Sequence, residues 1–432
     1  MPSTYQMCSV LLTALPLVVL LSTPCHSASA APDLLREAQD LLPYLREVRR
    51  HLHTIPELLY DLPKTSEYLR NQLDKLGIAY KHPVAETGIL ATIGKGTPKF
   101  ALRTDMDALP IEEDVDVPYK STHPGKMHAC GHDTHMAMLL GAATLLKARE
   151  AELPGTVVLL FQPAEEGGAG GKRFVEAGAL HGVLGVHGIH VWPGIPAGII
   201  TSRDNTIMAA ADRFWVNITG RGGHAAMPHL SIDPVVAASQ VVVALQPLVS
   251  RETSPTDSAV VSVSEFNTGP GASNVISDSV SMSGTLRAIT TSHFERMRDR
   301  ITEVIEGTAR LHGCTADLKW SEQAYIPTIN DGRMVAMVEA AAQKLVGAAR
   351  WQRMAEPTMA AEDFGFLADA VPGAFTFLGI QNEKAGSVHG LHTARFQMDE
   401  AQMPLGAALH ATVALDALSS HSAASKATKE EL

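Results

Sequence analysis

The sequence contains few cysteines, four in 432 residues. Cys8 and Cys25 lie in an N-terminal segment that we expect to be removed, which leaves Cys130 and Cys314 in the mature chain. Disulfide-dependent secreted domains carry more cysteines in much shorter chains. The sequence therefore excludes a disulfide-stapled fold, and we expect both remaining thiols to be unpaired, with Cys130 committed to a metal.

The sequence also lacks an excess of basic residues. Lysine and arginine total 35 against 46 aspartates and glutamates, and the formal net charge is −11. No basic block offsets this acidity, which excludes nucleic acid and anionic membrane surfaces as main partners. A length of 432 residues is sufficient for two domains and a sizeable core.

Long apolar runs are missing from the chain after its N-terminus. Residues 9–21 form the one such run, and Ala28-Ser29-Ala30 follows it as a small-residue cleavage pattern. Together they predict a secretory signal peptide over residues 1–30 and no membrane span in the mature chain. The end Lys429-Glu430-Glu431-Leu432 resembles the Lys-Asp-Glu-Leu retention signal. We therefore expect residence in the endoplasmic reticulum lumen, or a periplasmic or secreted protein if the source is bacterial.

Strands and helices alternate over residues 31–210 and again over residues 321–418. Continuous apolar strands such as 157–161 are typical of a buried, mostly parallel sheet, so these two segments predict one α/β layered domain. Residues 211–320 instead show half-exposed strands and two long helical patterns, which predicts an inserted α+β sandwich. Residues 419–432 are small and polar, and we expect a flexible tail there after a last helix ending near residue 418.

Metal-type side chains occur where predicted strands end. In the segment 127–135, Cys130 and His132 are two residues apart, so on an extended backbone both side chains would point the same way. Ligands bind outside the carboxyl ends of the strands in open α/β sheets, so we expect one shared rim. Thiolate, imidazole and carboxylate are ligands of zinc-like metals. The segments that we expect at this rim, besides Cys130 and His132, are 103–107, 162–168, 188–190 and 389–392.

Six runs of residues carry a resemblance to a known family. They are Arg103-Thr-Asp-Met-Asp-Ala-Leu-Pro110, Met127 to His135, Phe161 to Gly171, Gly188-Ile-His-Val-Trp-Pro193, Gly220-Arg-Gly-Gly-His-Ala-Ala226 and Ala361-Glu-Asp-Phe364. From about residue 35 to 418 the chain resembles the M20 metallopeptidase family, and most closely its D subgroup of amidohydrolases. That subgroup includes bacterial hippurate hydrolases and plant indole-3-acetyl-amino-acid hydrolases, and the plant enzymes are the nearest in pattern.

The resemblance implies a site for two divalent metal ions. Manganese is usual in the plant-like members, and zinc suits cysteine and histidine ligands equally well. The implied ligands are Cys130 as a bridging thiolate, His132, Glu166, His190 and His392. Glu165 is implied as the general base, and on an extended backbone it would face the substrate while Glu166 faces the metals.

The resemblance also implies roles for residues around the metals. His224 of the insert would stabilise the oxyanion in a neighbouring active site, and Asn274 and Arg287 would bind the substrate carboxylate or oxyanion. Asp105 and Asp107 would orient metal-bound imidazole. Further residues are expected to brace the site or to be structural: Glu362 and Asp363 for the former, His135, His187, His229 and His389 for the latter. The insert would act as a lid and, if a homodimer forms, as its contact.

The reaction implied by the resemblance is metal-dependent hydrolysis of the amide bond of N-acyl amino acids, with indole-3-acetyl conjugates as substrates. Two alternatives within enzymes are a hippurate or other N-acyl-amino-acid hydrolase and a dipeptidase. An alternative of a different class is a binding protein for acyl amino acids that has lost turnover. Glu165 argues against the binding protein, because such a protein has no need of a base.

Overall fold

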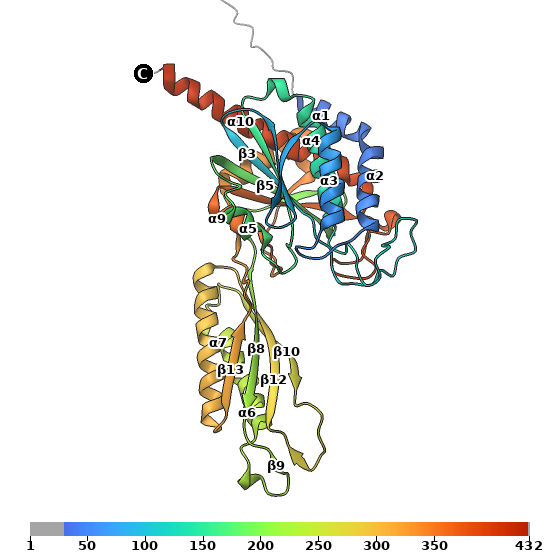
Figure 1. The fold of residues 1–432 in the computed structure, drawn as a ribbon. Helices are drawn as coiled ribbons and strands as arrows, with labels where there is room; N and C mark the ends of the chain where they lie inside the picture. The colour runs from blue at the N-terminus through green and yellow to red at the C-terminus, as the bar shows by residue number, and fades with distance from the viewer. Residues whose placement is uncertain (1–29, 431–432) are drawn as a thin grey trace, which may run out of the picture.

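The computed structural model describes residues 30–430, which form two lobes (Figure 1). The larger lobe is built around an eight-stranded sheet and the smaller lobe around a four-stranded sheet. The predicted fold class, an α/β layered domain with an inserted α+β sandwich, is confirmed. Residues 1–29 of the expected signal peptide, and Glu431 and Leu432 of the expected retention signal, lie outside the described residues.

The strands of the large sheet follow the order β1-β2-β4-β3-β5-β16-β6-β15. The four central strands β4, β3, β5 and β16 are parallel, and antiparallel pairs occur where β2 meets β1 and β4 and where β6 meets β16. The strands are β1 (Ala79–Val84), β2 (Gly88–Gly94), β3 (Lys99–Asp105), β4 (Thr156–Gln162), β5 (Val183–Pro196), β6 (Ile200–Ser202), β15 (Trp351–Arg353) and β16 (Gly373–Gln381).

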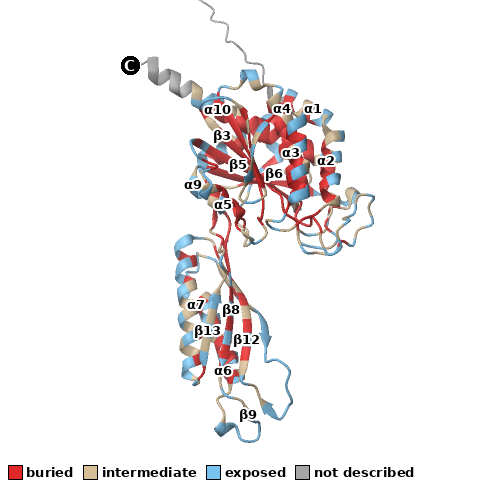
Figure 2. Ribbon diagram, in the orientation of Figure 1, coloured by how far each residue is buried: buried red, intermediate tan, exposed pale blue. Residues whose placement is uncertain are grey.

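Helices cover both faces of this sheet, and most residues of its central strands are therefore buried (Figure 2). Leu159 of β4 belongs to the core on one face, while the next residue, Leu160, belongs to the core on the other face. The first face is covered by α1 (Ala30–Asp40), α2 (Leu42–Thr54), α3 (Pro63–Lys75), α4 (His132–Lys147), α8 (Gly332–Val346) and α10 (Met403–Glu430). The second face is covered by α5 (Gly170–Glu176) and α9 (Phe364–Ala370).

The small lobe is an antiparallel sheet with helices on one face. Its strands, in the order β10-β12-β8-β13, are β10 (Ala259–Asn267), β12 (Ser279–Ala288), β8 (Ala210–Thr219) and β13 (Thr315–Trp320). Along β8 the side chains of Phe214, Val216 and Ile218 are buried and those between them are exposed, as a sheet with one solvated face requires. The buried face packs on α6 (Pro234–Pro247) and α7 (Thr291–Leu311).

Short elements complete the two lobes. The small ladder β9 (Gly223–His224) with β11 (Val275–Ile276) lies at the end of the small lobe farthest from the large sheet (Figure 1), and β7 (Asn205–Met208) pairs with β14 (Thr328–Asn330) near the junction. Single helical turns are η1 (Glu150–Glu152), η2 (Pro228–Leu230), η3 (Leu248–Glu252), η4 (Ala348–Arg350), η5 (Glu383–Ala385) and η6 (Glu400–Gln402).

One helix in the described part of the chain, residues 234–252, is long and apolar enough to cross a membrane by length and composition alone. It consists of α6 and the π turn η3. Ala237, Val241 and Leu245 of α6 are buried in the core of the small lobe. The apolar composition of this helix is thus partly used in packing against the four-stranded sheet.

The C-terminal segment differs from the prediction. We expected the last helix to end near Leu418 and a flexible tail to follow, but α10 continues to Glu430. Residues 419–430 contain alanine, serine, lysine and glutamate, with no glycine or proline. Nothing in this composition interrupts a helix that is already formed, because propagation needs no new nucleus.

Candidate active site

Cys130 lies between two imidazoles at the carboxyl edge of the large sheet. Its Sγ is 3.3 Å from Nε2 of His190, in β5, and 3.3 Å from Nε2 of His392, in the loop after β16. Nδ1 of His190 lies 2.7 Å from the carbonyl oxygen of Val191. A carbonyl only accepts, so Nδ1 carries the proton of the neutral ring and Nε2 is free to act as a ligand.

Two sets of potential ligand atoms share Cys130. One set is Cys130, His132 and His190, the other is Cys130, Glu166 and His392, and within each set the ligand atoms lie within 4.8 Å of one another. Nε2 of His132 is buried without a hydrogen-bond partner, and Oε1 of Glu166 lies 3.9 Å from it and 3.1 Å from Nε2 of His392. Buried polar atoms are normally satisfied, so this donor set fits two divalent cations that share a thiolate.

Acidic groups dominate the electrostatics of these two sets. Burial raises the pKa of the Cys130 thiol, and the neighbouring Glu166 raises it further. Burial opposes a charge on His132, but Asp105 and Asp107 outweigh burial and raise the pKa of His132 to about 10. An excess of buried carboxylates around a thiol and imidazoles is the environment in which a divalent cation is stabilised.

The backbone at Cys130 differs from the extended segment that we predicted. Gly131 has a φ of 88°, and His132 is the first residue of α4. A Cβ atom at position 131 would lie 2.6 Å from a methyl group of Val191, so glycine allows both the positive φ and the close approach to β5. The turn thus brings Cys130 and His132 to the same site by a different geometry.

Asp133 does not cap α4 with its side chain. No side-chain cap bond is present at the N-terminus of this helix. Oδ2 of Asp133 instead lies 2.8 Å from Nε of Arg49 and 2.7 Å from Nδ1 of His53. Because Asp133 directly follows His132, these two contacts connect the start of α4 to helix α2.

Glu165 and Glu166 lie in a turn, so the extended backbone predicted for this pair is wrong. The turn is closed by a 2.7 Å hydrogen bond from the N–H of Gly167 to the carbonyl oxygen of Glu165. The carboxylate of Asp107 accepts the N–H groups of Glu165 and Glu166 at 2.9 and 3.0 Å. Asp107 thus sets the positions of both glutamates, and it also lies 3.7 Å from Nδ1 of His132.

The carboxyl group of Glu165 is buried beside other acids. Burial raises the pKa of Glu165 well above its usual value, and Glu362 and Glu166 raise it further. The carboxylate oxygens of Glu165 and Glu166 also lie within 4.8 Å of a nitrogen of His132. A carboxyl with a raised pKa next to metal-type ligands is suited to accept and return a proton.

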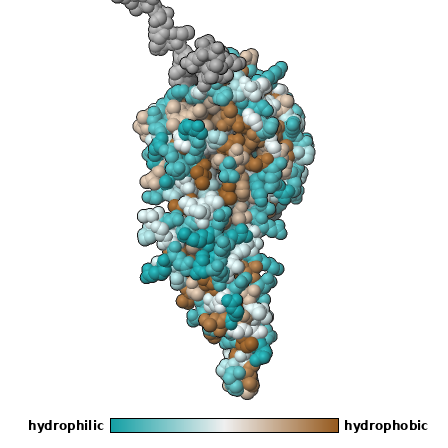
Figure 3. All heavy atoms as spheres, turned by 90° about the vertical axis from the view of Figure 1, so that its left-hand side faces the viewer, coloured by the Kyte–Doolittle hydropathy of each residue, from teal (hydrophilic) through white to brown (hydrophobic). Residues whose placement is uncertain are grey.

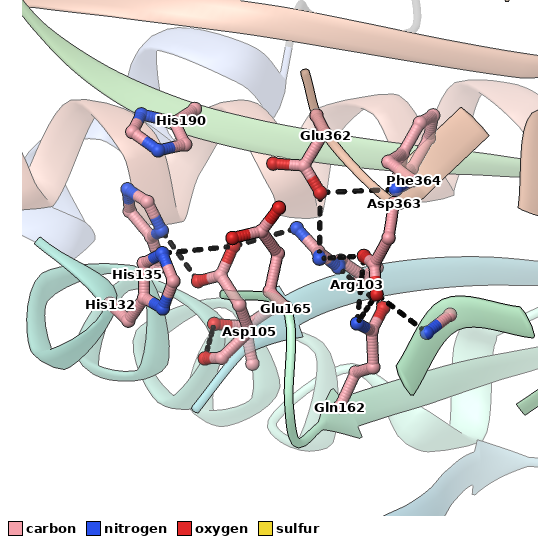
Figure 4. A network of polar contacts seen from close by, with 12 residues as sticks. Arg103, Asp105, His132, His135, Gln162, Glu165, His190, Glu362, Asp363 and Phe364 are labelled. Atoms are coloured by element: carbon pink, nitrogen blue, oxygen red, sulfur yellow. Dashed lines mark hydrogen bonds and ion pairs between the residues drawn. The ribbon is translucent and has the colours of Figure 1, made fainter. Parts of the chain in front are cut away.

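Arg103 in β3 is buried at the centre of a polar network beside Glu165 (Figure 4). Its guanidinium donates to four groups: Gln162 at 2.9 Å, Asp105 at 2.7 Å, and Glu362 and Asp363 at 2.9 Å each. Glu362 and Asp363 were predicted to brace the site, and the structure shows that they contact Arg103. Because the buried Arg103 pairs with three carboxylates, it holds the loop before α9 against β3 and β4.

Asp105 connects this network to the imidazoles. Its Oδ1 accepts from Nδ1 of His135 at 2.7 Å, and Nε2 of His135 accepts the backbone N–H of Val191 at 3.0 Å. Nε2 of His132 is farther away, 3.8 Å from Oδ2 of Asp105. Asp105 therefore hydrogen-bonds His135 rather than His132, and its influence on His132 in this structure is electrostatic.

A cavity of about 830 Å³ opens over these groups between the two lobes. The large lobe lines it with Cys130, Glu165, Glu166, His190 and His392. The small lobe contributes Arg213 and Trp215 from β8 and Arg287 from β12. Predicted residues of both lobes therefore meet in one cavity.

His224 and Asn274 do not line this cavity. His224 is exposed in β9, and β9 lies at the far end of the small lobe (Figure 1). Asn274 is close to it, since its carbonyl oxygen accepts the N–H of Ala225 at 3.0 Å. Within one chain, His224 and Asn274 are therefore not brought to the site in this structure.

Sequence reasoning gave no role to several residues of the site, among them Arg103, Arg213 and Tyr325. Arg103 gave a usable signal, because it is a charged residue inside an apolar strand pattern. Arg213 and Tyr325 gave none, since the cavity and the loop that they contact are formed by distant segments.

The fold and the site define an α/β protein with an inserted lobe and a candidate two-metal centre. Residues 101–416 match the model of the peptidase family M20/M25/M40. The chain is 44% identical over 402 residues to an Arabidopsis thaliana protein named IAA-amino acid hydrolase ILR1-like 4, covering 91% of each chain. It is 40% identical over 356 residues to the N-acetyl-L-cysteine deacetylase of Bacillus subtilis strain 168, covering 82% of this chain and 83% of that protein.

The solved structures agree with these matches. A Bacillus subtilis protein described as a dinuclear metal binding peptidase of the M20 family superposes with a TM-score of 0.75 at 34% identity. The match covers 88% of this chain and 99% of that protein. The chain belongs to the peptidase family M20/M25/M40.

Proposed function

We propose that the protein is a metal-dependent amidohydrolase that cleaves the amide bond of N-acyl amino acids, releasing the free acid and the amino acid. The observation that carries this proposal is the buried Glu165 beside the ligand sets that share Cys130, on the wall of a cavity that also contains Arg287. The names of the related Arabidopsis and Bacillus proteins support amides of amino acids as the substrate class.

In this mechanism the protein's own residues handle protons and orientation. Glu165 takes a proton from the water that attacks the amide carbon and returns it to the leaving nitrogen. Asp107 keeps Glu165 in place through the backbone N–H, and Arg287 receives the substrate carboxylate. Two divalent ions held by Cys130 and its partners would supply Lewis acidity and lower the pKa of water.

We propose manganese as the working ion and zinc as its alternative. Cys130, His132, Glu166, His190 and His392 are the residues that would hold both ions. Carboxylate and imidazole ligands suit manganese, whereas thiolate and imidazole suit zinc, so the mixed donor set supports a comparison of the two ions.

We propose an aromatic acyl group, with indole-3-acetyl conjugates as the preferred class. Trp192 and Trp215 line the cavity from different lobes, and Leu391 adds apolar surface. Aromatic side chains stack on flat rings and bury a large apolar area. The names of the Arabidopsis relatives support the same class.

A substrate panel tests the proposed function. The protein is stripped of metal, reloaded with manganese or zinc, and assayed with indole-3-acetyl-alanine, N-benzoyl-glycine and alanyl-alanine. We expect turnover of both acyl amino acids and little of the dipeptide. Faster cleavage of alanyl-alanine would instead support a dipeptidase, and tight binding of the acyl amino acids without turnover would support a binding protein.

We also propose that the small lobe carries the contact of a homodimer, in which His224 of a second copy completes the site. The exposed apolar residues Met227, Leu230 and Val275 near β9 support this proposal, and Figure 3 shows hydrophobic surface toward the narrow end of the molecule. Sedimentation of the parent and of Leu230→Glu tests it. A parent that remains monomeric at high concentration would contradict it.

A further inference from the structure

Two arginines of the small lobe stand side by side on the face that lines the cavity. In the antiparallel pairing of β8 with β12, Arg213 lies opposite Thr285 and Arg287 lies opposite Ala211. Two register steps separate the arginines, so both project from the same face of the sheet. The neighbours Phe214 and Leu286 are buried on the other face, in the core of the lobe.

Neither arginine has an acidic partner among the residues that the structure describes. Other arginines of the same lobe do: Arg298 lies 3.3 Å from Asp212 and Arg300 lies 2.9 Å from Glu252. Burial lowers the pKa of Arg287, and the charge of Arg213 lowers it further. Two neighbouring guanidinium groups without a counter-ion repel each other, and an anion between or beside them relieves the repulsion.

The cavity is therefore polarised. Its large-lobe wall carries the acidic and metal-type residues, including Glu165 and Glu166, and its small-lobe wall carries the two arginines. When the reacting amide of a substrate lies at the large-lobe wall, its amino-acid part faces the small-lobe wall. One of the two guanidinium groups can bind the α-carboxylate of the substrate through two hydrogen bonds. The other guanidinium group is then free to bind a second anionic group.

We propose that Arg213 is a specificity residue that binds a side-chain carboxylate, so that the protein prefers N-acyl amino acids with an acidic side chain. In this arrangement Arg287 binds the α-carboxylate and Arg213 binds the carboxylate of aspartate or glutamate. The inference rests on the proposed amidohydrolase function, and it adds the class of amino acid that this site selects.

The test compares N-benzoyl-glutamate with N-benzoyl-glutamine, two substrates of nearly equal size that differ in one charge. We expect kcat/KM of the full-length, metal-loaded protein to be about tenfold higher for the glutamate compound, as for a charge-assisted bond at a partly solvated site. Arg213→Gln should reduce this ratio to about one and leave the glutamine compound within about twofold of the parent. Higher salt should lower the ratio for the parent only.

Lys319→Gln is the matched control. Lys319 is an exposed cation opposite Trp215 in the same sheet, but it does not line the cavity, so its removal should leave the ratio unchanged. A parent ratio near one would overturn the inference and leave the amidohydrolase proposal standing. An equal loss for both substrates in Arg213→Gln would also overturn it, because Arg213 would then bind the α-carboxylate.

Failure of the proposed function gives a different result, namely no turnover of any N-acyl amino acid. Calorimetric binding of the two benzoyl compounds then continues the test. Tighter binding of N-benzoyl-glutamate that disappears in Arg213→Gln would support the acidic subsite without hydrolysis. Equal binding of the two compounds would overturn it.

Discussion

The hydroxyl oxygen of Tyr325 accepts the backbone N–H of Gly167 at 2.8 Å. The same oxygen accepts the N–H of Ala169 at 3.3 Å, and its own hydrogen is donated to the carbonyl oxygen of Glu165. Tyr325 also pairs with Ala211 through two backbone hydrogen bonds of 2.9 and 2.8 Å. One side chain at the junction of the lobes therefore holds the turn that carries the proposed base.

We expect Tyr325→Phe to lower kcat about tenfold without loss of metal, since the turn loses its shared partner and Glu165 is positioned less well. Stopped assays and metal analysis of the purified variant measure both quantities. Tyr80→Phe is the control, because that hydroxyl makes a 3.3 Å contact with Asp74 at the surface. A fall in melting temperature with an unchanged kcat would show that Tyr325 is structural only.

Glu165→Gln should retain metal and bind substrate but lose turnover by about a hundredfold or more, because an amide cannot take a proton from water. Glu166→Gln should instead lower the metal content, since a neutral amide is a poorer ligand for a dication. Metal analysis and kcat at saturating substrate separate the two roles. If Glu165→Gln were the variant that lost metal, the assignment of the pair would be reversed.

Cys130→Ser should lower metal content and activity together. A serine hydroxyl is not deprotonated by these ions as readily as a thiol, so the shared ligand is weakened. Cys314→Ser is the matched control, because Cys314 is a free thiol buried in the small lobe, where no role in the site is expected. Full metal occupancy in Cys130→Ser would contradict the bridging thiolate.

Arg103→Met should destabilise the fold by about 3–5 kcal/mol, because it leaves three buried carboxylates without their cation. Urea unfolding of the metal-free protein measures the loss. Arg353→Met serves as the comparison, since Arg353 forms exposed ion pairs with Asp204 and Glu339, which are worth about 0–1 kcal/mol. Equal losses in the two variants would mean that the buried network contributes no more than a surface pair.

His53 predicts a pH dependence of stability. Burial and Arg49 lower its pKa, but Asp133 and Glu113 outweigh them, and the net result is a raised pKa. A raised pKa in a basic group gives stability that is fully present below the unfolded value, about 6.5, and is lost as pH rises through the folded value. The cost of His53→Gln in unfolding free energy should therefore be larger at pH 6 than at pH 9.

His51 provides a control with the opposite sign. Burial lowers the pKa of His51, so its contribution to stability rises with pH instead of falling. The difference between parent and His51→Gln should change with pH in the direction opposite to that for His53→Gln. Parallel slopes for the two variants would contradict the assigned causes.

The sequence allowed the layers of the fold and the ligand sets to be predicted because both follow local rules. The strand end that places Glu166 is visible as an apolar run followed by polar residues, and an open α/β sheet brings such ends together. The strand end expected at His190 is wrong, because β5 continues to Pro196. The local backbone was harder to predict. The positive φ of Gly131 and the turn at Glu165 depend on β5 and on Asp107, which are distant in the sequence.

Non-local contacts explain what could not be predicted. Tyr325 lies 160 residues from Glu165 along the chain, and no periodicity relates them. The place of His224 is a related case, because its glycine-rich motif is recognisable but its distance from the cavity depends on the length and direction of the small lobe (Figure 1). Side-chain chemistry was readable from the sequence, whereas the orientation of one lobe toward the other was not.

The two chain segments that connect the lobes are hydrogen-bonded to each other at Ala211 and Tyr325, and this makes the small lobe a structurally separate module. The chain leaves the large lobe and returns to it at adjacent, hydrogen-bonded positions, so a short linker could span the gap. Neither of the two cores that flank the large sheet, as described, includes a residue between 212 and 324. The lobe that carries Arg213 and Arg287 can therefore differ between relatives. Substrate selectivity can then change in evolution while the hydrolytic centre stays unchanged.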